Sequence, residues 1–391
     1  METTINLFNK IKTLMSENSL FLLVFILFLP DYALYPAMGI AWIFVMYEFF
    51  KYKGFNWSFF WLLLLYLMIV SLVSKNYKGF AGALYLIILY AYGGSIKRRV
   101  TPKTYMELQF YIVFSSLFNF FFNFIHWRPS WYDWFMGQFS WIIDFGGLPF
   151  YGDGYMRAYS TFDNPNFYAF ILLIVLLVCF NQIQFQLTFK NYKLMFFYIG
   201  AFIINFYALL LTGTRSILVA LGLGLVTILL AQRKWMQLKV LIFLGAAAVL
   251  FIMSNASLFP RFMQISQHSE IRFTIWETAL TQIQKEPWFG KGLFTYEFLF
   301  DRSDAHNIFI ESFLSMGIMG TFIFLVYVIE KIYYYYNNAY YLDYPLALSV
   351  IISTIMYGIF DIPLFAVQTS MLFIAVLCLP TRDKEFLKEL T

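Results

Sequence analysis

Residues 306–329 read HNIFIESFLSMGIMGTFIFLVYVI, a run long and apolar enough to cross a membrane as a helix. Immediately before it stands the polar segment Asp301-Arg302-Ser303-Asp304-Ala305. The sequence therefore places His306 and Asn307 where a polar segment turns into a membrane span. A neutral imidazole at such a boundary is able to take a proton from a group that reaches it from the membrane surface.

The composition extends this reading to the whole chain. Of 391 residues, 61% are hydrophobic and only 13% are charged, which is far from the composition of soluble domains. Backbone polar groups in lipid must be satisfied internally, and continuous apolar runs without alternation favour helices over a barrel. The predicted fold is all-α, a polytopic helical membrane protein. Its two cysteines, Cys179 and Cys378, both fall in predicted spans and indicate neither a disulfide nor a metal framework.

The apolar runs predict about twelve spans in a single transmembrane domain, 1–391. The predicted parts are an N-terminal group of five spans at 1–125, a first outer loop at 126–165, four spans with the Arg215 turn at 166–254, a second outer loop at 255–305, three C-terminal spans at 306–380, and a tail at 381–391.

The basic residues predict the orientation of these spans. With both termini in the cytoplasm, the inner segments hold seventeen of the twenty-seven Lys and Arg residues, mostly on short loops, where the positive-inside bias acts. Both long loops then face outward. The net charge of +5 reflects this bias and gives no indication of a nucleic-acid partner.

The arginines expected on the outer side are the informative ones. Arg215 lies in a connection too short for a solvated loop, so it needs an anionic partner, an aqueous cavity, or room to snorkel to lipid head groups. Residues 271–283 predict a short amphipathic helix lying on the outer surface, with Arg272 on its polar side and Trp276 at the interface. Arg272 would face a lipid head group or simply pack on Trp276.

Several polar residues near His306 have two readings each. Asn307 would orient a sugar hydroxyl or cap the span, and Glu311 would orient Asn307. Asp301 and Asp304 would hold Mg²⁺ over a diphosphate or be merely solvated, and the second reading is preferred, so no metal site is predicted.

An ordered set of motifs resembles the O-antigen ligase and O-antigen polymerase superfamily of membrane glycosyltransferases, over residues 155–325. These motifs are Arg157 followed by Phe162-Asp-Asn-Pro-Asn166, Thr212-Gly-Thr-Arg215-Ser, the outer helix with Arg272 and Trp276, Pro287-Trp-Phe-Gly-Lys-Gly292, and His306-Asn307 before Gly317-Ile-Met-Gly320.

The resemblance implies transfer of an oligosaccharide from a polyprenyl diphosphate to an acceptor at the outer face of the cytoplasmic membrane, by a metal-independent, inverting mechanism without a cofactor. It implies that His306 is the catalytic residue, that Arg215 and Arg272 hold the diphosphate, and that Arg157 and Asn166 are supporting residues. Similarity to other membrane glycosyltransferases, which place an acidic catalytic residue in the first outer turn, makes Asp31 the alternative catalytic residue. The chemistry agrees, because arginine pairs bidentately with phosphate and a histidine can deprotonate an acceptor hydroxyl.

The sequence leaves the acceptor open. A polymerase would extend another lipid-linked repeat unit, and is favoured because no separate outer domain for a protein acceptor is evident; a ligase would use a different lipid, polymer or protein. A transporter or flippase for the same lipid-linked glycans is less favoured, since mid-span positions are almost free of charge. A catalytically silent scaffold is a further alternative. The expected partners are a polyprenyl-diphosphate-linked oligosaccharide, a glycan acceptor, membrane lipids and other polysaccharide-assembly proteins.

Overall fold

The computed structural model describes residues 19–52, 58–127, 150–152, 155–162, 164–254, 266–301, 304–339 and 344–379. Most of the predicted first outer loop, the start of the second and the predicted tail at 381–391 lie outside these ranges. Contacts divide the chain into two compact units, one of residues 1–49, 92–212 and 371–391 and the other of residues 50–91 and 213–370. The prediction of a single transmembrane domain stays a prediction.

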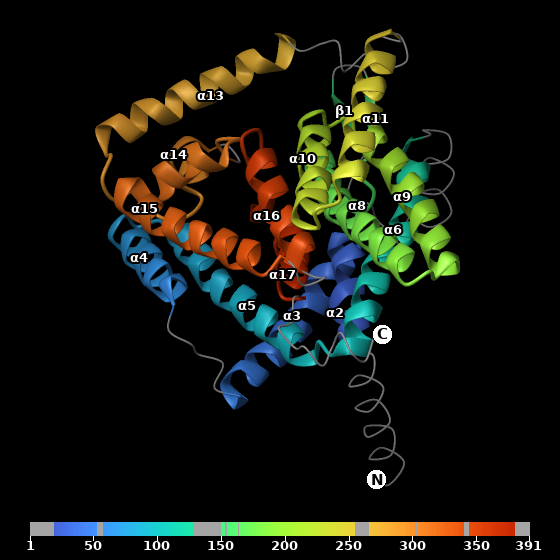
Figure 1. The fold of residues 1–391 in the computed structure, drawn as a ribbon. Helices are drawn as coiled ribbons and strands as arrows, with labels where there is room; N and C mark the ends of the chain where they lie inside the picture. Colours follow the sequence, from blue (N-terminus) through green and yellow to red (C-terminus); the bar gives the residue numbers. More distant parts are fainter. Residues whose placement is uncertain are drawn as a thin grey trace. The chain divides into compact units, whose positions relative to one another are not determined.

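The prediction of a polytopic helical membrane protein is confirmed (Figure 1). Five of the described helices are long and apolar enough to cross a membrane by length and composition: α3 (Asp31–Lys51), α5 (Tyr77–Arg99), α8 (Pro165–Thr188), α9 (Tyr192–Leu211) and α15 (Ile308–Asn337). Shorter apolar helices are α4 (Phe59–Val73), α10 (Ser216–Ala231), α11 (Trp235–Ser254), α16 (Tyr344–Gly358) and α17 (Val367–Leu377).

The remaining elements are smaller or less apolar. They are α2 (Ser19–Phe25), the 3₁₀ turn η1 (Ile26–Phe28), α6 (Pro102–Trp127), α13 (Ser266–Lys285), α14 (Thr295–Phe300) and the 3₁₀ turn η2 (Pro363–Phe365). A short antiparallel pair, β1 (Phe150–Gly152) and β2 (Tyr155–Arg157), departs from the purely helical prediction. It falls in the stretch 144–157, which holds four glycines and two aspartates, residue types that favour turns over helix.

The first unit is built around α8. Eighteen of its 24 residues are buried, and it packs on α9 and α6. Its start is fixed by Asn164, whose side chain accepts a hydrogen bond from the Asn166 amide, and by Pro165 at the first helical position. Buried amides link α8 to α6, where Gln182 donates to Gln109 over 2.8 Å. Such side-chain hydrogen bonds join spans where lipid supplies no hydrophobic driving force.

The second unit carries α15, which is interrupted at Gly317. Gly317 has φ +59° and ψ −171°, so the helical ladder breaks there. The loop Pro287–Gly292 satisfies the freed backbone groups: Ile318 N donates to Pro287 O over 2.8 Å, and Gly292 N donates to Ser315 O over 2.8 Å. This loop therefore braces the broken helix, which explains the spacing of the Pro287–Gly292 and Gly317–Gly320 motifs.

Two residues from the N-terminal part of the second unit hold the same loop. The Tyr66 hydroxyl lies 2.8 Å from Phe289 O and 2.7 Å from Met316 O. Asn76 is fully buried, and its side-chain amide donates to the carbonyls of Lys291 and Leu293. The motif loop, α4, the α4–α5 turn and α15 thus form one hydrogen-bonded assembly.

We expect Gly317→Ala to lower the free energy of unfolding by roughly 2–4 kcal/mol, because it combines an unfavourable backbone conformation with overpacking. A Cβ at this position would lie 2.4 Å from the backbone of Trp288, which cannot yield as a side-chain tip would. Thermal unfolding of the purified protein in detergent measures the effect. Gly222→Ala on α10 is the matched control, since nothing lies within 4 Å of its Cβ. Equal melting temperatures for the two variants would contradict the support that the Pro287–Gly292 loop is argued to give to α15 at Gly317.

Candidate functional site

His306 lies in the loop between α14 and α15, two residues before α15 begins at Ile308. Its backbone is left-handed, with φ +48°, a conformation that costs a non-glycine residue about 1–3 kcal/mol. The turn is closed by Asp304, whose Oδ1 accepts the His306 backbone N–H over 2.6 Å. This strained turn sets the direction in which the imidazole leaves the loop.

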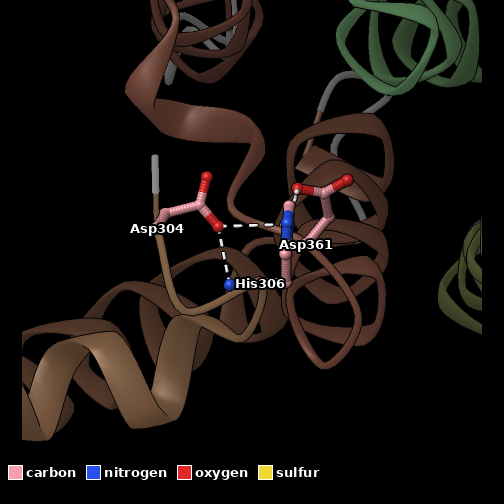
Figure 2. A group of neighbouring side chains, drawn as sticks. All are labelled: Asp304, His306 and Asp361. Carbon is pink, nitrogen blue, oxygen red and sulfur yellow. Dashed lines mark hydrogen bonds and ion pairs between the residues drawn. The ribbon is translucent and has the colours of Figure 1, made fainter. Parts of the chain in front are cut away.

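The imidazole of His306 lies between two carboxyl groups, those of Asp304 and Asp361 (Figure 2). Its Nδ1 is 3.2 Å from Asp304 Oδ1 and 3.7 Å from Asp361 Oδ1. The carboxylate of Asp361, and then that of Asp304, raise the pKa of His306 above its ordinary value, while burial and the charge of Arg272 act in the opposite direction. The arrangement makes His306 a stronger base than a free imidazole.

Asp361 is a site residue that the sequence interpretation missed. It is buried just beyond the end of α16, where Oδ1 accepts the Ile362 amide over 2.8 Å and Oδ2 lies 3.5 Å from the Tyr357 hydroxyl. The available signal was a single acidic residue between two apolar runs, followed by Pro363. A lone carboxylate at such a boundary is costly unless it has a partner, which is the physical reason to single it out.

Asn307 caps α15. Its Oδ1 accepts hydrogen bonds from the amides of Phe309 and Ile310, and its Nδ2 donates to Ile359 O over 2.9 Å. Of the two readings, capping is the one that the structure supports. Because Ile359 stands two residues before Asp361, the same side chain ties the His306 loop to the segment that carries the second carboxylate.

Glu311 holds neighbouring backbone groups instead of orienting Asn307. Its carboxylate is buried in the first turn of α15 and accepts hydrogen bonds from Ala305 N over 3.1 Å, Tyr296 N over 3.3 Å and the Ser315 hydroxyl over 3.2 Å. The interpretation that Glu311 orients the Asn307 side chain is replaced by this one. Glu311 joins α14 and the His306 loop to α15.

Arg272 lies on α13, which begins and ends beyond the predicted 271–283 helix. Ile275 and Ala279 are buried against Tyr296 and Leu314, so α13 packs on α14 and α15 (Figure 1). Arg272 is half-buried, and its positive charge is near enough to His306 to lower the pKa of the imidazole. Arg272 and His306 are therefore close enough for their charges to interact.

The other predicted arginines are placed differently. Arg215 is half-buried at the start of α10, and α10 packs on α16 through a hydrogen bond from the Ser353 hydroxyl to Ala220 O. Its approach to the diphosphate site stays a prediction. Arg157 lies in the first unit, buried, and donates to Thr212 O over 2.8 Å and to Asn166 Oδ1 over 2.7 Å. The structure therefore brings Arg157 and Asn166 together.

The carboxyl groups of Asp304 and Asp361 and the imidazole of His306 offer ligand atoms within 4.8 Å of one another, the kind of donor set that binds a divalent cation. Asp301, which we paired with Asp304 in the metal alternative, instead ends α14 in a left-handed conformation and is not in this group. Asp31 begins α3. The prediction of a site without metal stays a prediction.

Residues 200–325 match the family model described as O-antigen ligase. The resemblance inferred from the sequence is thereby confirmed. The matched segment includes Arg215, Arg272, His306, Asn307 and Glu311, whereas Arg157, Asn166 and Asp361 lie outside it. None of the curated proteins compared with the chain matches it.

Proposed function

We propose that this protein is a membrane glycosyltransferase that transfers an oligosaccharide from a polyprenyl diphosphate to an acceptor hydroxyl at the outer face of the cytoplasmic membrane. One observation carries the proposal. His306, at the start of a candidate span in the segment similar to O-antigen ligases, faces two carboxylates and stands within electrostatic reach of Arg272.

His306 acts as the general base. In this proposal the proton of the neutral imidazole is on Nδ1, the nitrogen that lies beside Asp304 and Asp361, so the lone pair of Nε2 accepts the proton of the acceptor hydroxyl. As the imidazole becomes positive in the transition state, the two carboxylates stabilise it. The raised pKa of His306 and the position of its ring beside two carboxylates therefore both favour its action as a base.

Arg272 and Arg215 hold the diphosphate. The acceptor oxygen attacks the anomeric carbon, the bond from that carbon to the diphosphate oxygen breaks, and the negative charge that develops on the leaving group is stabilised by the guanidinium groups. Direct displacement of this kind inverts the anomeric centre and passes through no covalent enzyme intermediate. Arginine is suited to the task because it stays charged and matches phosphate oxygens with a rigid fork of donors.

The proposed acceptor is a second lipid-linked repeat unit, which makes the protein a repeat-unit polymerase. Among the described residues of the predicted outer loops, regular structure beyond the ends of flanking spans is limited to the β1–β2 pair and helices α13 and α14. These elements offer little surface for docking a large protein acceptor. The second candidate is a ligase that uses another lipid, polymer or protein, and the family match is compatible with either acceptor.

The test uses purified full-length protein with a synthetic polyprenyl-diphosphate oligosaccharide. Extension of the glycan without an added acceptor, unaffected by a chelator, is the expected result and supports the metal-independent polymerase. Product formed only on an added acceptor would establish the ligase in place of the polymerase. Labelled lipid that crosses reconstituted vesicles with no change in glycan length would overturn both proposals in favour of a flippase.

A further inference from the structure

Ala305, the residue directly before His306, is held on both of its peptide groups. The indole Nε1 of Trp276 on α13 donates to Ala305 O over 3.0 Å, and Glu311 on α15 accepts from Ala305 N over 3.1 Å. Ala305 itself is fully buried. Its position is thus fixed by two side chains from two different helices.

This double attachment matters because of the backbone that follows. His306 adopts a left-handed conformation, and such a conformation persists only where its surroundings determine it. The bond from Trp276 ends on the carbonyl of the very peptide unit whose N–H Asp304 accepts. The peptide unit between Ala305 and His306 is therefore hydrogen-bonded at both ends, to Trp276 through its carbonyl and to Asp304 through its N–H. The imidazole of His306 extends from the residue that follows this peptide unit.

Trp276 also stands one helical turn after Arg272 on α13. Ile275 and Ala279 pack this helix against its neighbours, so one packed helix positions both Arg272 and Trp276. The same helix thus carries the charge that acts on His306 and the indole that holds the His306 loop.

We propose that Trp276 is a positioning residue that fixes the distance between the diphosphate-binding Arg272 and the base His306 by holding the Ala305–His306 peptide. This inference rests on the proposed function for its catalytic meaning. The positioning itself is a property of the chain that is measured without substrate.

Trp276→Phe removes the indole N–H and keeps an aromatic ring against Phe273, which contacts Trp276 edge to face. We expect kcat for glycan extension to fall about fivefold to tenfold, the equivalent of one lost hydrogen bond, with KM for the lipid donor unchanged because Arg272 remains. Backbone amide exchange at Ala305 and His306, measured on the full chain in detergent, should become faster. Trp288→Phe is the matched control, since the Trp288 side chain is exposed and outside this loop.

Glu311→Gln is a second variant that weakens a hydrogen bond to Ala305, and it replaces Trp276→Phe as the test if that variant folds poorly. It should speed exchange at the same amides, and the double variant should lose less than the product of the single losses, because both side chains act on one residue. Exchange and kcat in Trp276→Phe equal to those in Trp288→Phe would overturn the proposal. A fully active His306→Ala would refute the proposed function instead, and would leave the exchange result to decide the positioning.

Discussion

His306→Ala is expected to lower kcat for glycan transfer by about 10²–10⁴-fold, the usual contribution of a positioned general base. KM for the lipid donor should change little, because the diphosphate is held by arginines. The physical reason is the arrangement of the imidazole, whose Nδ1 lies beside the carboxyl groups of Asp304 and Asp361. Steady-state extension of the synthetic lipid-linked oligosaccharide measures both constants.

The control is His268→Ala, which changes another histidine on the same helix that carries Arg272. It should retain the activity of the unaltered protein. Equal activities of His306→Ala and His268→Ala would remove His306 from the chemistry. Loss of activity in Asp31→Ala but not in His306→Ala would move the catalytic site to Asp31.

Arg272→Ala is expected to lower kcat/KM by about 10²–10³-fold, the effect of losing one charged group that stabilises a developing anion. Arg272→Lys should recover only part of the loss, because an ammonium lacks the bidentate fork. The change also removes a positive charge that lowers the pKa of His306. The acid limb of the rate profile should therefore move to higher pH in Arg272→Ala.

Arg98→Ala serves as the control for removing an arginine, since this residue lies near the end of α5 and pairs loosely with Glu48 over 3.4 Å. We expect it to act like the unaltered protein. An Arg272→Ala variant with the same kcat/KM as Arg98→Ala, and with an unmoved pH profile, would show that Arg272 takes no part in holding the donor.

Much of the fold was predictable because its signals are local. The predicted spans correspond to helices, and His306 and Asn307 stand at the boundary where the hydropathy changes. A long apolar run in lipid forms a helix, because a helix satisfies all of its backbone hydrogen bonds internally. The length and position of the run therefore predict the helix. The interruption of α15 at Gly317 was marked by the glycine but needed the Pro287–Gly292 loop to explain it.

The missed features depend on long-range pairing. Asp361 comes near His306 only because the end of α16 packs against the start of α15, where Asn307 donates to Ile359 O. Nothing in the local sequence of Glu311 indicates that it accepts from Ala305 and Tyr296. Likewise Trp276 resembled an interfacial anchor, and its bond to Ala305 joins residues 29 positions apart. Helical periodicity gives the face of a side chain and leaves its distant partner open.

The pH dependence of kcat/KM in the unaltered protein and in Asp361→Asn tests the central claim most directly. A base works in its neutral form, so the rate should rise with pH through the pKa of His306, above the ordinary value of 6.5. Asp361 is the largest cause of that elevation, so the limb should move to lower pH in Asp361→Asn while the maximal rate falls. An acid limb at the same pH in both proteins would contradict His306 as the base of this reaction.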